Sequence, residues 1–304
     1  MLVDFLWEKK MKSVLSLVKN NIKYLSLNAL RIAFAISTVA SIYEIAIGKI
    51  IDEQADIYKT IGILVFVFCI LYLLCFITSF VTIICQKNKV VFSTDRHSVY
   101  IHFDDLFDNK IINNKTEQKH IVITVNRCFD TIINNELISE KSIHGNVFKS
   151  LYNVKKYTQE TLQEAINNSL QNVPYSELTR EIKSQGNLKR YEVGTVVKID
   201  DSNTKSYYLL AMTTIDKDLT AHASKEDFVL SIQRLIEYCD KNSQGYPVLM
   251  PLLGSGLSRT GIDSYSDILQ YTIDAFRLNK TIINCDFHIY IQPKDKQKIN
   301  FGVL

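Results

Sequence analysis

The most constraining feature of the sequence is an uninterrupted apolar run at residues 61–85. None of its 25 residues carries a charge. The hydrocarbon core of a bilayer is about 30 Å thick, and roughly 20 helical residues are needed to cross it. The run is therefore predicted to be a transmembrane helix. The alternative is a buried helix of a soluble protein, and the length of the run argues against it.

A weaker apolar segment precedes this run, at residues 26–48. Arg31 and Glu44 bracket its uncharged core (32–43) and lie 13 positions apart, which is about 20 Å along a helix. We expect this segment to be the first of two spans. The two charges then either mark the two edges of the bilayer or face a partner helix. A cleaved signal peptide does not fit, because the segment begins too far into the chain and a second span follows.

The two spans are expected to act in a homo-oligomer, because two helices per chain are too few to enclose a water-filled path. The second span carries hydroxyl side chains that can hydrogen-bond between helices: Thr78, Ser79 and Thr82. Such bonds contribute about 1 kcal/mol each. They are too weak to hold an oligomer permanently, which suits an assembly that a ligand switches on.

Flanking charges predict the orientation of this hairpin. Basic residues precede the first span and follow the second (Lys9, Lys10, Lys12, Lys19, Lys23; Lys87, Lys89, Arg96). The connecting loop 51–60 is acidic, with Asp52, Glu53 and Asp56 against Lys59. The positive-inside rule then places both termini in the cytoplasm. We expect an inner-membrane protein with a cytosolic segment at 1–25, spans within 26–86, and a cytosolic domain at 92–304.

Composition excludes several other classes of protein. The formal net charge is only +3, which argues against a nucleic-acid partner recruited by overall charge. Hydrophobic residues make up 47% of the chain, too many for a disordered protein. The six cysteines form no CxxC pair, so neither a zinc knuckle nor a disulfide framework is predicted, and a reducing compartment fits better.

The remainder of the chain alternates predicted strands and helices, which is typical of an α/β domain with helices on both faces of a sheet. Ser224 is a predicted N-cap, with Asp227 three residues later. The Lys-rich stretch 294–298 is predicted to be a solvated loop. The predicted strands are 98–103, 120–125, 194–199, 206–212, 246–252 and 286–292, and the predicted helices are 146–152, 158–171, 225–242 and 263–279.

A glycine loop after one predicted strand is the clearest chemical signal. Strand 246–252 is followed by Gly254, Ser255 and Gly256, and a helix begins a few residues later. Glycines allow a tight turn and a close approach of the backbone to a ligand. The N–H groups of such a loop suit a diphosphate. The spacing is neither GxGxxG nor a Walker loop, so an ordinary turn is the alternative.

Polar side chains follow two other predicted strands. Asn126 and Asp130 come just beyond strand 120–125, where α/β sheets bind ligands. The sequence SIHG at 142–145 adds a hydroxyl, an imidazole and a glycine turn, although His144 alone also fits a loop histidine that orders its own backbone. Asp104 and Asp105 follow strand 98–103, either to accept hydrogen bonds from an adenine amino group or as a solvated acidic turn.

Taken together, these motifs resemble a macro domain, the fold that binds ADP-ribose. The order is DDLF, NRCFD, SIHG, YEVGTVV and MPLLGSGLSRTG. With the two apolar helices, NRCFDT and ISEKSIHG resemble the membrane-anchored macro-domain effectors of Thoeris antiphage systems. The resemblance covers essentially the whole chain and implies a macro-domain-like mixed sheet preceded by a transmembrane hairpin.

The resemblance also implies the ligand contacts. Asp105 matches the residue that holds adenine, with Leu106 beside it, and Asn126 matches the asparagine near the distal ribose, with Asp130 following. The diphosphate loop corresponds to Gly254, Ser255, Gly256, Leu257 and Ser258. The other ligand-facing loop corresponds to Ser142, His144 and Gly145. Hydrolytic macro domains carry a run of glycines after the asparagine, and this chain does not.

Two functions follow from the resemblance. In the first, a TIR-domain NADase makes an ADP-ribose-derived messenger, such as histidine–ADP-ribose. The macro domain binds this messenger without cofactor or metal, and the helices then disrupt the membrane and arrest the infected cell. The second is a membrane-tethered ADP-ribosyl hydrolase. Beside these two functions, a membrane-anchored ADP-ribose scaffold is a third hypothesis. A hydrolase needs a group that activates water, for which Asp130 and His144 are the candidates.

The predicted topology can be tested by labelling single cysteines from outside intact cells. In a chain without its native cysteines, a cysteine at Gln54 should react with an impermeant maleimide, because loop 51–60 is predicted to be external. A cysteine at Asn88 should not react. Labelling at Asn88 but not at Gln54 would refute the orientation and, with it, a cytosolic ligand.

Overall fold

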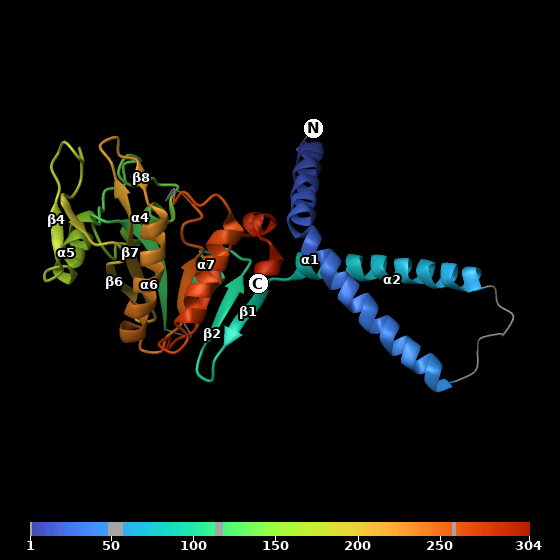
Figure 1. Cartoon of the computed structure of the whole chain (residues 1–304). Coiled ribbons are helices and arrows are strands. Elements are labelled where there is room, and N and C mark those ends of the chain that lie inside the picture. Colours follow the sequence, from blue (N-terminus) through green and yellow to red (C-terminus); the bar gives the residue numbers. More distant parts are fainter. Residues whose placement is uncertain (1, 48–56, 113–117, 257–259) are drawn as a thin grey trace. The chain divides into compact units, whose positions relative to one another are not determined.

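The computed structural model describes residues 2–47, 57–112, 118–256 and 260–304. The chain forms two compact units (Figure 1). The helical unit comprises Met1–Lys87 and Lys294–Leu304, and the α/β unit comprises Asn88–Pro293. The α/β unit therefore begins four residues before the predicted boundary at 92. The last eleven residues, which the sequence predicts to be part of the α/β domain, belong to the helical unit.

The helical unit contains two long helices, α1 (Leu2–Ile47) and α2 (Ile57–Cys85). The predicted N-terminal segment 1–25 is therefore helical over its described part and continuous with the first predicted span. Two stretches are long and apolar enough to cross a membrane, Trp7–Ser41 and Ile61–Cys85. The second coincides with the predicted span. Residue 48 and the side chain of Glu44 lie outside the described part of the chain.

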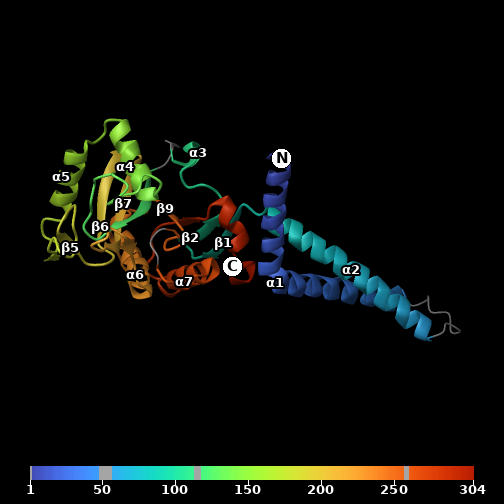
Figure 2. The same cartoon turned by 90° about the horizontal axis from the view of Figure 1, so that it is seen from above.

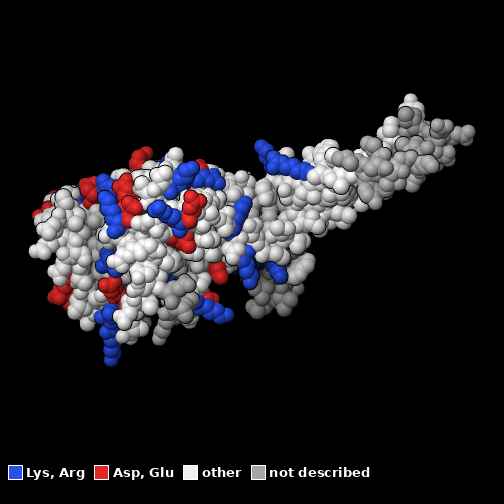
Figure 3. Space-filling model, turned by 90° about the horizontal axis from the view of Figure 1, so that it is seen from below, with Lys and Arg blue, Asp and Glu red and all other residues white. Residues whose placement is uncertain are grey.

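Small and aromatic side chains hold α1 against α2. Ala29, Ala33 and Cys75 are buried at this contact, and the rings of Phe34 and Phe68 lie 5.2 Å apart. Small residues let two helix backbones approach closely, which is the usual way that membrane helices pack. Many of the other described side chains of α2 are apolar and exposed. Figure 3 shows few charged side chains along the described part of the hairpin, in contrast to the mixed charges of the α/β unit.

The hydroxyl groups of α2 do not all act as predicted. Ser79 does bond across helices, because Asn28 Nδ2 donates to Ser79 Oγ at 3.0 Å within the same chain. Thr78 instead donates to the Cys75 carbonyl, and Thr82 donates to the Thr78 carbonyl. Both threonine hydroxyls are therefore satisfied by their own helix, as is common for Ser and Thr residues within helices.

The α/β unit is built on one mixed sheet, as predicted, with the order β1-β2-β10-β9-β3-β7-β6 and β8 paired to β7. The five central strands, β2, β10, β9, β3 and β7, are mutually parallel, and β1 and β6 run antiparallel at the edges. The strand bounds are β1 (Asn88–Ser93), β2 (Ser98–His102), β3 (Lys119–Asn126), β6 (Val196–Ser202), β7 (Lys205–Ile215), β8 (Ala221–His222), β9 (Val248–Pro251) and β10 (Phe287–Tyr290), with a separate hairpin of β4 (Tyr175–Glu177) and β5 (Lys189–Tyr191).

Helices cover both faces of this sheet (Figure 2). One side carries α4 (Ile143–Asn153) and α5 (Gln159–Ser169), and the other carries α6 (Lys225–Asn242) and α7 (Tyr265–Leu278). A short α3 (Asn109–Ile112) lies between β2 and β3 in the chain. Alternate strand residues serve the two sides, as the period of two requires. Tyr207 joins the core of α4 and α5, whereas Tyr208 contacts Tyr238 of α6.

The predicted capping of α6 is confirmed. Ser224 accepts a hydrogen bond from the Asp227 N–H, and the Asp227 carboxylate accepts one from the Ser224 N–H. This reciprocal pair satisfies two backbone donors at the start of the helix. The predicted helix at 146–152 begins earlier, at Ile143, because Ser142 is its N-cap.

Candidate functional site

The parallel strands end at one edge of the sheet, and the sheet opens there between β3 and β9. These strands pair only at His120–Val248 and Ile121–Leu249, whereas β3 stays paired with β7 as far as Asn126. The chain leaves β3 toward β7 and leaves β9 toward β10. Neighbouring parallel strands whose connections diverge in this way form the crevice where α/β sheets bind ligands.

Pro251 supplies a physical reason for the opening. Leu252 N–H donates to the Tyr290 carbonyl on β10. Successive residues of a strand point their backbone groups to opposite sides, so Pro251 faces β3. Proline has no N–H to donate and interrupts a ladder wherever it lies. The β3–β9 pairing therefore cannot continue through this position.

The glycine loop follows β9 at this opening. Gly254 has a φ of 78°, and a Cβ at this position would lie 3.0 Å from the Phe228 ring and 3.2 Å from Thr260. Glycine is thus required both by conformation and by close packing. Ser255 Oγ donates to the Leu252 carbonyl at 2.6 Å, and Tyr265 donates to the Ser255 carbonyl at 2.8 Å.

Gly256 differs from Gly254 in its surroundings. A Cβ at Gly256 would meet no atom within 4 Å. The N–H groups of Gly254 and Gly256 make no hydrogen bond within the described residues. Within the described residues, the loop therefore combines open space at Gly256 with backbone donors that have no partner. Leu257 and Ser258, which the sequence assigns to the same loop, lie outside the described residues.

Asn126 ends β3 on the opposite side of the opening. Its side chain is buried, and its Oδ1 accepts hydrogen bonds from the N–H groups of Cys128 (3.0 Å) and Asp130 (3.4 Å). The carboxamide oxygen therefore shapes the loop that follows the strand. Asn126 Nδ2 donates to no partner within the described part of the chain and remains available to a ligand.

Asp130 lies in different surroundings from those expected of a ligand-facing residue. It is 1% exposed and forms a 2.5 Å ion pair with Lys183, which is fully buried. The other carboxylate oxygen accepts the Asn187 N–H at 2.6 Å, and Gly186 packs so closely that a Cβ there would lie 2.2 Å from that oxygen. Asp130 thus fixes the 183–187 turn, a role that the sequence did not reveal.

The sequence SIHG forms the start of α4. Ser142 Oγ accepts the Gly145 N–H at 3.0 Å and donates to the Ser139 carbonyl at 2.7 Å. A Cβ on Gly145 would lie 2.2 Å from the Ser139 oxygen, so only glycine fits. The side chain of Ser142 and the backbone of Gly145 are therefore engaged in the cap. The N–H groups of Ile143 and His144 make no hydrogen bond within the described residues.

His144 is the unusual side chain of this segment. It is 8% exposed, it packs edge-on against Phe148, and its buried Nε2 has no hydrogen-bond partner within the described residues. Burial lowers the pKa of His144 to about 3, so the ring is neutral near pH 7. A buried polar atom without a partner is costly and identifies a position where a ligand donor or acceptor would be stabilising.

Asp105 and Leu106 follow β2 and are separated from the glycine loop by β10. Asp105 is exposed, and its Oδ1 accepts the Phe107 N–H at 3.0 Å. Leu106 is buried in the core beside α4 and α5. Asp105 is thus accessible to a ligand, and Leu106 can contribute only through its backbone. Asp105, Asn126 and the glycine loop all follow parallel strands and lie at the same edge of the sheet.

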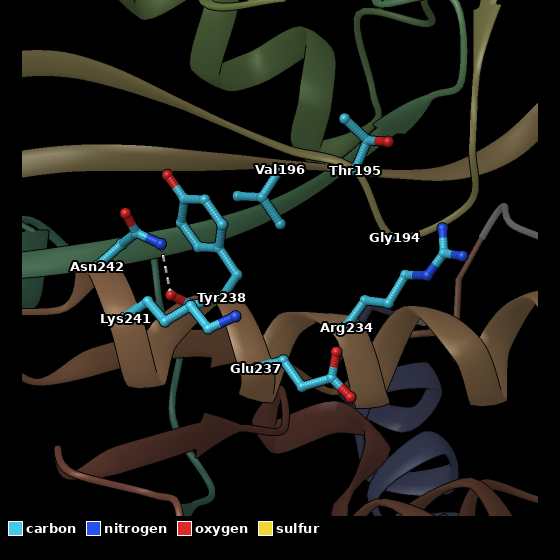
Figure 4. A pocket seen from close by; sticks show the side chains of 8 residues that line it. All are labelled: Gly194, Thr195, Val196, Arg234, Glu237, Tyr238, Lys241 and Asn242. Atoms are coloured by element: carbon cyan, nitrogen blue, oxygen red, sulfur yellow. Dashed lines mark hydrogen bonds between the residues drawn. The ribbon is translucent and has the colours of Figure 1, made fainter. Parts of the chain in front are cut away.

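A hollow of about 320 Å³ lies elsewhere, along α6 and the segment 194–196 at which β6 begins (Figure 4). None of the predicted site residues lines it. The Arg234 guanidinium in this hollow donates to the Val193 carbonyl. The hollow is lined by Gly194, Thr195, Val196, Arg234, Glu237, Tyr238, Lys241 and Asn242.

Comparison with known proteins identifies the family. The model of the Thoeris protein ThsA macro domain matches residues 99–292, which include the sheet from β2 to β10. The chain belongs to the ThsA macro-domain family. This family places it in Thoeris antiphage defence, with an ADP-ribose-type ligand for the macro domain.

The individual proteins that resemble this chain have low sequence identity to it. Thoeris protein ThsA of Bacillus amyloliquefaciens (strain Y2) is 24% identical over 219 residues, which cover 70% of this chain and 69% of that protein. A macrodomain of Oceanobacillus iheyensis solved with ADP is 12% identical, covers 69% of this chain and 90% of its own, and has a TM-score of 0.41. A D40A mutant of that macrodomain is 14% identical over the same 69%, with 93% of its own chain covered and a TM-score of 0.42.

Acid should destabilise the protein through His144. The pKa of His144 falls from 6.5 to about 3 on folding, so the unfolded chain binds the proton more tightly. His144 therefore makes its full contribution to the free energy of unfolding above pH 6.5. This contribution is lost as the pH falls toward 3, by at most about 1.4 kcal/mol per pH unit. His144→Leu should remove this component, measured as a flatter dependence of melting temperature on pH in detergent. Equal pH dependence in both proteins would contradict it.

Proposed function

We propose that this protein is a membrane-anchored receptor whose macro domain binds an ADP-ribose-derived messenger, and that the two apolar helices then assemble and disrupt the membrane. The messenger would come from a TIR-domain NADase, and histidine–ADP-ribose is the specific candidate. The proposal requires no cofactor. The observation that carries it is that the N–H groups of Gly254 and Gly256, beside the opening between β3 and β9, make no hydrogen bond within the described residues.

A diphosphate suits this loop for electrostatic reasons. Backbone N–H groups directed into open space act as partial positive charges toward an anion. The N–H groups of Ile143 and His144 at the start of α4, an 11-residue helix, have no partner in the described part of the chain. They add a second set of donors that favours an anion. The two sets follow β9 and β3, the two strands that border the opening.

The spacing of the strands suits an elongated ligand with two different ends. Asp105 follows β2 and Asn126 follows β3, which are three strand spacings apart in the sheet, or about 14 Å. The carboxylate of Asp105 can accept hydrogen bonds from an amino group at one end. Asn126 Nδ2 can donate to a ribose hydroxyl at the other end, with the phosphates between them at the glycine loop.

Binding without turnover is favoured over hydrolysis by the state of the two candidate bases. The Asp130 carboxylate is already paired with Lys183 and with the Asn187 N–H. The low pKa of His144 makes its imidazole a weak base near pH 7, and a general base works best when its pKa lies near the operating pH. A hydrolase would also have no evident need for two long apolar helices.

Replacing Gly256 by glutamate should abolish binding of ADP-ribose and of histidine–ADP-ribose. The space around Gly256 is open, so the new side chain should leave the fold intact. It would occupy the opening and place a negative charge beside the phosphates. Calorimetry on the full chain in detergent, with mass spectrometry of the recovered ligand, measures both affinity and turnover.

Gln244→Glu is the matched control, because it adds the same charge to an exposed turn at the opposite end of β9. It should bind like the wild type. Wild-type affinity in Gly256→Glu would refute this location for the diphosphate. Conversion of the ligand by the wild type would favour the hydrolase.

Messenger binding should make the hairpin permeabilise membranes. The purified chain in liposomes loaded with a quenched dye should release dye only when the messenger is added. Glu44→Leu should reduce release without changing messenger affinity, since a charge at depth in the bilayer is expected to be paired between subunits. Release that does not depend on messenger, or undiminished toxicity of a chain lacking residues 1–87, would refute the mechanism.

A further inference from the structure

The C-terminal eleven residues, 294–304, fold against the helices rather than forming a solvated tail. They form the short helices η1 (Pro293–Lys298) and η2 (Phe301–Val303). We call residues 294–304 the C-terminal clamp. Ile299 and Phe301 of the clamp are 0% and 2% exposed, which is unusual for the end of a chain.

Asn21 of α1 is the centre of this contact. It is 1% exposed. Its Nδ2 donates to the Ile299 carbonyl at 3.0 Å and to the Leu17 carbonyl at 2.9 Å, and its Oδ1 accepts the Phe301 N–H at 2.6 Å. A buried carboxamide with both ends satisfied specifies one register of the clamp on α1, because a shift would leave buried polar groups without partners.

Lys296 connects the clamp to the end of α2. Its Nζ donates to the Ile84 carbonyl at 2.9 Å and to the Gln86 carbonyl at 2.6 Å. The last carbonyls of a helix lack partners within the helix and carry its negative dipole end, so an ammonium group is well suited to this position. The clamp thus contacts α1 through Asn21 and the end of α2 through Lys296.

The chain joins the two units at two places, and both joints are short. Only Gln86 and Lys87 separate α2 from β1, and only Ile291 and Gln292 separate β10 from η1. Gln86 lies in the first of these joints, and Lys296 lies shortly after the second. The hydrogen bond from Lys296 to the Gln86 carbonyl therefore ties the two joints together.

The same strand is bonded to two segments of the proposed ligand site. The Tyr290 carbonyl of β10 accepts the Leu252 N–H, two residues before Gly254. The Ile291 N–H donates to the His102 carbonyl, three residues before Asp105. The end of β10 lies between the strand that leads to the adenine-binding residue and the strand that leads to the glycine loop.

We propose that the C-terminal clamp transmits ligand binding in the macro domain to the membrane hairpin, with Asn21 and Lys296 as its coupling residues. The proposal rests on the function proposed above. A ligand that spans Asp105 and the glycine loop changes the position of β10 relative to its neighbours. The clamp passes this change to α1 and α2 together, so both helices respond as one body.

Breaking the clamp should uncouple response from binding. In Asn21→Leu and Lys296→Met, dye release from liposomes should need at least about tenfold more messenger, within the usual range of coupling between sites. Messenger affinity and leakage without messenger should equal those of the wild type. Lys294→Met is the control: Lys294 is exposed, and its side chain makes no contact that the structure describes.

Trp7, the only tryptophan of the chain, gives a second readout that does not depend on membrane damage. It lies on α1, ten residues before Leu17. ADP-ribose and histidine–ADP-ribose, added in turn, should change its fluorescence in the wild type and in Lys294→Met, but not in the two clamp variants. Retained affinity in those variants shows that their macro domain is folded.

Each outcome separates the two proposals. If the wild type binds messenger and Trp7 responds but no dye is released, the proposed membrane lesion is wrong and the clamp stands. If the clamp variants respond like the wild type in both assays, or if Trp7 fails to respond in a wild type that releases dye, transmission through the clamp is refuted. Release without messenger in Asn21→Leu would also refute it, since the clamp would then be a restraint.

Discussion

The early end of the pairing between β3 and β9 is the constraint on which the ligand site depends. A continuous ladder between these strands would bring Asn126 and the glycine loop to one strand spacing, about 4.8 Å, and would leave no room for a ligand between them. Pro251 ends the ladder because it cannot donate toward β3, and each side of the opening is bonded to a neighbouring strand, Leu252 to β10 and β3 to β7. The opening is therefore built into the backbone and does not depend on side-chain rotamers.

The buried pair of Asp130 and Lys183 performs a similar task on the β3 side. Desolvating two charges is expensive, and a buried ion pair is stable only if its remaining hydrogen-bonding capacity is also satisfied. Here the Asn187 N–H and the Asn187 carbonyl complete the pair. The loop that follows Asn126 consequently has little freedom to collapse into the opening. Removing one partner alone would leave an uncompensated charge, so Asp130 and Lys183 act as one unit.

Much of the fold could be predicted from local patterns, whereas contacts between distant residues could not. The span 61–85, the cap at Ser224 and the parallel strands all follow from composition and periodicity over short windows. Lys183 lies in a polar stretch without periodicity, and it is buried by its ion pair with Asp130, which is distant in the chain. Lys296 lies in a stretch that the sequence predicts to be solvent-exposed, and its hydrogen bonds go to the distant end of α2. The pairing of Asp130 is not predictable from the sequence for the same reason, since proximity to a strand end does not reveal whether a carboxylate is already paired.

The pairing of polar groups within the hairpin limits how copies can associate. Thr78 and Thr82 are bonded to their own helix, and Ser79 is bonded to Asn28, so these three hydroxyls of α2 are already satisfied within one chain. Apolar side chains alone give little preference for another helix over lipid. Arg31 of α1 is an exposed charged residue of the predicted first span and has no ion pair within the described residues. Assembly between copies is thus better explained by contacts along α1 than along α2. The clamp is bonded to α1 at Asn21, ten residues and fewer than three helical turns from Arg31.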